Sequence, residues 1–189
     1  MSRIRALKHP HLSCALLGHL LLFATLTQSA ESASFLSLFR AIDERLGYME
    51  DVALFKAQNQ IPIEDRARER IVLADAKAFA ASQGLNAQTT EQFFNAQIIA
   101  AKAIQYRYRA ELLTLGVAQR SVDLQGSIRP KLDRLGSEIT RLFGELLRQH
   151  GALEETHRDL FKDGINSRLL NEPEKHALFN AMLQVRLEK

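Results

Sequence analysis

The chain has 189 residues, of which 46% are hydrophobic and 25% charged, enough to bury one core and too apolar for a disordered tail. Leu and Ala dominate, Trp is absent, and only 9 Gly and 4 Pro interrupt the chain, which disfavours a sandwich or barrel of short strands and favours helices. The formal net charge of +3 indicates a basic protein, but the first thirty residues are its source.

This N-terminal segment has the parts of a secretory signal peptide. Three basic residues precede a mostly apolar run over residues 12–26, and small or polar residues follow up to Ala30. The run is shorter than the roughly 20 residues that a membrane span needs. We therefore predict that residues 1–30 are cleaved and that residues 31–189 form a periplasmic or secreted domain. An uncleaved membrane anchor is the alternative.

Removal of the signal peptide changes the charge and the cysteine content. It takes away three basic residues and no acidic one, which leaves 22 of each in the mature chain. Neither nucleic acid nor a membrane is therefore an expected partner of the mature protein. The single cysteine, Cys14, is lost as well, so the mature chain offers no disulfide, no cysteine ligand and no cysteine nucleophile.

The mature sequence has helical periodicity throughout and predicts an all-α fold, a single helical-bundle domain of about six helices. The first helix is expected over residues 34–58 and a break over residues 59–61, because the residue before a proline avoids the α region. The second helix is expected to run from Pro62, with proline in its first turn, to Gly84.

The third helix is expected to begin near Asn86 or Thr89, where Thr89 and Gln92 have the spacing of a capping box, and to end at Gly116. A long polar connection follows. The remaining helices are expected over residues 130–151, over residues 152–162, and from Asn171 to the C-terminus.

Charged residues at helix positions that face inward are the most informative feature of the sequence. Arg45 and Lys56 are eleven residues apart, close to three turns, so they leave the first helix on nearly one face with Cα atoms about 16 Å apart. A small anion fits between two such side chains. Two other helices contribute further positions. Their spacing puts Asp65, Arg68, Glu69 and Val72 on one face of the second helix, and Ala101 and Gln105 one turn apart in a mostly apolar run of the third.

The alternative is that these cations are surface charges paired with Glu44, Asp51 and Glu64. Signatures of hydrolases, phosphate loops and metal sites are absent from the sequence. His150 and His157 stand seven residues apart across a break, a poor metal geometry, and are expected to be exposed. We therefore expect no metal.

The run from Ile42 to Lys56 resembles the first active-site helix of the AroQ-class chorismate mutases. The resemblance continues from Pro62 to Glu69 and from Phe93 to Gln105. The combination of residues is specific for this class. It consists of an Arg, a Lys eleven residues later, an Asp-x-x-Arg, and a Gln on a third helix. The signal peptide and the additional C-terminal helices resemble those of the secreted γ subclass.

The resemblance implies conversion of chorismate to prephenate, a unimolecular rearrangement that needs no cofactor. It implies that Arg45 and Arg129 hold the two carboxylates and that Lys56 and Gln105 contact the ether oxygen, with Arg45, Lys56 and Gln105 as the catalytic set. The other implied substrate-binding residues are Asp65 and Arg68, which shape the pocket, Glu69, which accepts from the ring hydroxyl, and Val72 and Ala101, which line it.

Two other functions remain open from the sequence. An isochorismate pyruvate lyase would use the same cationic pocket on a related substrate. A non-catalytic periplasmic helical binding module would instead have an exposed apolar groove and no tight site for a small dianion. The resemblance also implies a homodimer.

Overall fold

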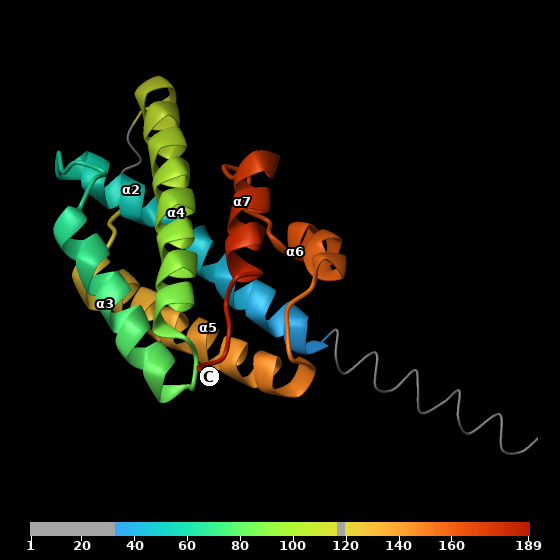
Figure 1. Ribbon diagram of the computed structural model, residues 1–189. Coiled ribbons are helices and arrows are strands. Elements are labelled where there is room, and N and C mark those ends of the chain that lie inside the picture. Colours follow the sequence, from blue (N-terminus) through green and yellow to red (C-terminus); the bar gives the residue numbers. More distant parts are fainter. Residues whose placement is uncertain (1–32, 117–119) are drawn as a thin grey trace, which may run out of the picture. The chain divides into compact units, whose positions relative to one another are not determined.

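The computed structural model in Figure 1 describes residues 33–116 and 120–189 of the chain. The predicted signal peptide, residues 1–30, lies outside the described residues. Within them the fold is an all-α bundle, as predicted, and the one strand-like pairing is an isolated antiparallel bridge between Leu85 and Leu187.

The predicted first helix consists of two consecutive segments. Residues 33–47 are helical, Tyr48 is a turn, and α2 spans Met49–Gln58. The N–H of Val52 still donates to the carbonyl of Tyr48 at 3.0 Å, and Figure 1 shows the two segments following one line, from blue to cyan. The turn at Tyr48 therefore leaves the helix axis nearly unchanged, and the helix face that carries Arg45 continues into α2.

α3 spans Arg66–Ser82 and starts four residues later than the predicted start at Pro62. The reason is the N-cap: the carboxylate of Asp65 accepts from the backbone N–H of Arg68 at 3.0 Å. An earlier start would place Ile61 at the cap, and an aliphatic side chain cannot satisfy a free N–H at the end of a helix.

α4 spans Ala87–Leu115, and the side chain of Asn86 caps it by accepting from the N–H of Thr89 at 3.0 Å. Of the two predicted starts, the one at Asn86 is correct. After the connection, a π-helical turn, η1, spans Leu124–Ile128 and continues directly into α5, Arg129–His150.

The C-terminal part is built from short elements. They are η2 (Glu155–His157), α6 (Arg158–Gly164) and α7 (Glu172–Met182). The predicted cap of the last helix is confirmed, because Asn171 and Glu174 each accept from the other's backbone N–H at 2.9 Å. α7 ends before the C-terminus, and the segment after it returns to the start of α4, where the N–H of Asn86 donates to Arg186 O at 2.9 Å.

Aromatic packing joins the C-terminal elements to the rest of the bundle. Phe161 of α6 lies between Phe39 of the first helix and Phe179 of α7, with ring centroids 5.3 Å away on each side. All three rings are fully buried. Since burying one such side chain contributes about 1.5–3 kcal/mol, this stack holds α6 and α7 without a covalent link.

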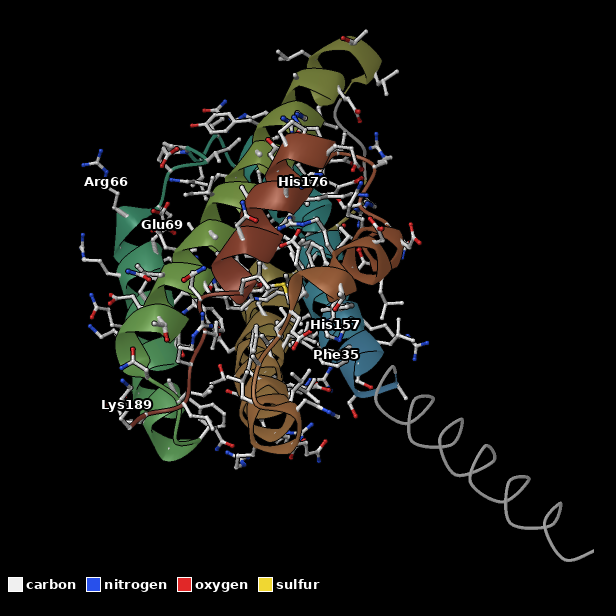
Figure 2. All side chains as sticks on the ribbon, turned by 45° about the vertical axis from the view of Figure 1, so that its right-hand side comes forward. Phe35, Arg66, Glu69, His157, His176 and Lys189 are labelled. Carbon is white, nitrogen blue, oxygen red and sulfur yellow. The ribbon has the colours of Figure 1, made fainter. Side chains whose placement is uncertain are left out.

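The expectation that His150 and His157 are exposed is wrong. Both imidazoles pack on the buried ring of Phe35, with centroids 5.4 Å and 3.8 Å away. Figure 2 shows Phe35 and His157 next to each other where the first helix meets the C-terminal segments. The sequence pattern missed this contact because it brings together residues from distant parts of the chain.

Candidate active site

The helices α2, α3, α4 and α5, together with the first helix and η1, surround one cavity. Its volume is about 100 Å³, on a scale where one water needs roughly 10–15 Å³. The nine residues singled out from the sequence all line it: Arg45, Lys56, Asp65, Arg68, Glu69, Val72, Ala101, Gln105 and Arg129. The tertiary structure therefore brings together side chains from five separate segments.

Arg45 enters the cavity from the first helix and is only 5% exposed. Its Nε is buried without a hydrogen-bond partner. Burial lowers the pKa of Arg45 to about 10, partly opposed by the charge of Asp133, so the guanidinium is still protonated at neutral pH. A buried cation with an unused donor is costly, and an anionic ligand would supply the missing acceptors.

Lys56 lies on α2 and is 6% exposed. Its Nζ donates to the carbonyl of Ile63 at 2.6 Å, which uses one of its three N–H groups and leaves two for a ligand. Burial lowers the pKa of Lys56 below its ordinary value, and the nearby carboxylate of Asp65 works in the opposite direction.

Gln105 reaches the cavity from α4 and is 5% exposed. Its Nε2 donates to the sulfur of Met49 at 3.6 Å, and its Oε1 is buried without a partner. Because a thioether is a weak acceptor, the amide is positioned in the cavity without being strongly held. It remains available as a hydrogen-bond donor.

Arg129 begins α5 at the edge of the cavity. Its Nη1 donates to Gln125 Oε1 at 2.8 Å, and its Nη2 lies 3.6 Å from the carboxylate of Asp65. Asp65 therefore caps α3 and also directs Arg129. The π-helical turn that precedes α5 supplies Gln125, so the polar connection contributes directly to the position of this arginine.

The α3 side of the cavity carries a mixture of charges. Arg68 pairs with Asp133 of α5. Glu69 lies 3.5 Å from Lys102 of α4. In Figure 2, Glu69 lies where α3 faces α4, whereas Arg66, almost one turn earlier, points away from the bundle.

The surface-pair alternative is wrong for Arg45 and Lys56, which are buried. The acids proposed as their partners pair elsewhere: Asp51 with Arg120, and Glu64 with Lys102 at 2.9 Å. Spacing alone could not decide this point, because it does not show which helix face is covered.

Eight further residues line the cavity that were not predicted from the sequence, although spacing could have indicated some of them. Met49 and Val52 follow Arg45 by four and seven residues on the same face, and Asp133 follows Arg129 by four. The others come from the tertiary arrangement. The complete missed set is Met49, Val52, Ile63, Ile98, Lys102, Leu124, Leu132 and Asp133.

The cavity has an excess of positive charge. Five of its lining residues are basic (Arg45, Lys56, Arg68, Lys102 and Arg129) and three are acidic (Asp65, Glu69 and Asp133), an excess of two. This balance fits a small ligand with two carboxylates. Among the described residues, no group of histidine and acidic side chains has the arrangement of a metal site.

Comparison with known proteins agrees with this site. The family described as "Chorismate mutase type II" matches residues 36–106. The chain is 38% identical to the secreted chorismate mutase of Yersinia pestis over 78% of this chain and 79% of that protein. It is 31% identical to the monofunctional chorismate mutase of Enterobacter agglomerans, over 83% and 86%.

The fold agrees as well. The crystal structure of the Yersinia pestis secreted enzyme matches with a TM-score of 0.74 and 35% identity, over 80% of this chain and 98% of that one. The all-α bundle and its cationic cavity thus define an enzyme of the helical, type II class. The chain belongs to the chorismate mutase family. The expectation of an exported protein agrees with the secreted relative, and no described helix is both long and apolar enough to cross a bilayer.

Proposed function

We propose that the cavity binds chorismate and that its own side chains promote the rearrangement to prephenate. The observation that carries the proposal is the pair of buried cations, Arg45 and Lys56, facing one cavity with unused donors. The two-charge excess of the lining supports a dicarboxylate substrate. Arg45 and Arg129 would bind the carboxylates, since guanidinium groups hold them in fixed orientation.

In this rearrangement a C–O bond breaks while a C–C bond forms within one molecule, and no group is transferred to the protein. Catalysis therefore depends on holding the reactive conformer and on stabilising the negative charge that develops on the ether oxygen. Lys56 and Gln105 would donate to that oxygen. Val72 and Ala101 would shape the apolar side of the pocket, with Asp65 and Arg68 holding its charged side and Glu69 accepting from the ring hydroxyl.

The direct test is an ultraviolet assay of chorismate consumption by protein lacking residues 1–30, in buffer with a chelator. Prephenate should form at an enzymatic rate. Conversion of isochorismate instead would favour the lyase, and no turnover of either compound by a folded, helical sample would favour the binding module. Sedimentation of the same sample tests the homodimer, which we propose on the family resemblance, and N-terminal sequencing of exported protein tests cleavage after Ala30.

Activity should change little between about pH 5.5 and pH 8.5, because the amide of Gln105 has no proton to gain or lose in this range. At higher pH, turnover should fall as Lys56 loses its proton. Because burial lowers the pKa of Lys56, this fall should occur below pH 10.5, the ordinary lysine pKa. The measurement is kcat against pH, with circular dichroism at each pH to exclude unfolding. A steep loss just above neutrality in folded protein would contradict the assignment.

Replacement of Arg129 by alanine should raise KM about tenfold or more and change kcat less, because the guanidinium at the cavity edge binds a carboxylate and does not face the breaking bond. Steady-state kinetics separates the two constants. Gln125→Ala is the matched variant, since it removes the 2.8 Å contact that directs Arg129 but keeps the charge, and it should raise KM by a smaller factor. A loss confined to kcat would contradict this role.

A further inference from the structure

Asp133 is an acidic residue inside a cavity built for a dianion, and neither the sequence resemblance nor the proposed mechanism gives it a role. It lies on α5, four residues after Arg129, and lines the cavity together with the cations. Its Oδ1 accepts from Nη2 of Arg68. Half of its side chain is exposed, so the carboxylate stands at the mouth of the cavity.

The charge of Asp133 acts on two cations of the site. It forms an ion pair with Arg68 and is the charge that favours the protonated form of buried Arg45. Without Asp133, Arg68 would lose its ion-pair partner, and the positive charge of Arg68 disfavours the protonated form of Arg45. In the ligand-free protein Asp133 therefore offsets part of the positive charge of Arg68 and Arg45.

We propose that Asp133 is an internal counter-ion that the substrate's carboxylate replaces, and that it limits the affinity of the site for chorismate and prephenate. This inference rests on the function proposed above. Two carboxylates at the same cations repel each other, so a bound dianion weakens the contact between Asp133 and the arginines. The same repulsion helps the dianionic product to leave. Asp133 acts through Arg68 and Arg45 and is a positioning residue, not a catalytic one.

The first test is Asp133→Asn, which keeps the shape of the side chain and removes its charge. KM for chorismate and the inhibition constant of prephenate should both fall about two- to fivefold, the range expected of a partly exposed ion pair. The melting temperature without ligand should fall, and its rise on adding prephenate should exceed that of the unmodified protein. If Asp133 had only a structural role, its replacement would lower the melting temperature without tightening the binding of chorismate or prephenate.

Two variants control for charge and size. Asp133→Glu keeps the charge and should leave KM and the prephenate inhibition constant within about twofold of the unmodified values. Glu145→Gln makes the same change of net charge farther along α5, where Glu145 pairs with Arg141 at 2.7 Å and does not line the active-site cavity, and it should not tighten prephenate binding. If Asp133→Asn does not fold, Asp133→Ser gives the same readouts.

Arg45→Met separates this inference from the proposed function. If Arg45→Met still binds prephenate as the unmodified protein does, the assignment of the cavity as the chorismate site is wrong. If Arg45→Met loses binding while Asp133→Asn binds prephenate equally or more weakly, the cavity is the chorismate site and the counter-ion role of Asp133 is wrong. Tighter binding in Asp133→Asn that disappears at high salt supports the proposal.

Discussion

Replacement of Lys56 by methionine should lower kcat/KM for chorismate by about 10³-fold, because in the proposed mechanism this buried ammonium would donate to the ether oxygen as negative charge develops there. The methionine side chain keeps most of the volume, so the bundle should fold. With the carbonyl of Ile63 left without its 2.6 Å donor, we expect a modest loss of melting temperature. Steady-state kinetics and thermal unfolding measure the two effects separately.

Lys102 offers a matched control for this variant. It lines the same cavity and carries the same charge, but Glu64 and Glu69 hold its ammonium at 2.9 Å and 3.5 Å. Lys102→Met should therefore change kcat/KM by less than about tenfold. Equal losses in the two variants would mean that net charge alone, and not the position of Lys56, supports catalysis.

The second large effect is expected at Gln105. Its replacement by alanine should lower kcat about 10²-fold and change KM much less, because its amide would contribute chiefly when charge develops on the ether oxygen. Single-turnover measurements with excess enzyme would separate the chemical step from product release. Near-normal turnover of Gln105→Ala would remove the amide from the proposed mechanism.

Gln105→Glu gives an independent check of the donor role. A carboxyl group can donate to the ether oxygen only while it is protonated, so the activity of this variant should fall as pH rises, whereas the unmodified protein should stay nearly constant. The sulfur of Met49, which accepts from the amide nitrogen at 3.6 Å, could accept from a protonated carboxyl group but not from a carboxylate, so this contact also favours the protonated form. A flat pH profile for Gln105→Glu would contradict the assignment.

The all-α class and most helices could be predicted from local signals. The cap at Asn171 and the end of α3 before Gly84, whose φ is +67°, depend on residues close in sequence. The start of α3 was misplaced because Pro62 and Asp65 are both good start residues, and only the structure shows which one is used. Local propensity does not rank two compatible starts.

The prediction of the site rested on residue spacing and on the family resemblance, not on local helix signals. Spacing placed Arg45 and Lys56 on one face, and the family resemblance supplied the roles and added Arg129. The pairing of Arg68 with Asp133 could not be predicted, because these residues are 65 positions apart and only the packing of α3 beside α5 brings them together.

By itself the sequence determined the helical class, the balanced charge of residues 31–189, their lack of cysteine and the helix faces that carry the cations, since all of these depend on composition or on the 3.6-residue period. The tertiary structure alone decided that Arg45 and Lys56 are buried and that the first helix, α2, α3, α4, η1 and α5 share one cavity. It also decided that three carboxylates offset part of the positive charge there. Burial and charge balance depend on which helices pack together, and that is set by contacts between residues far apart in the chain.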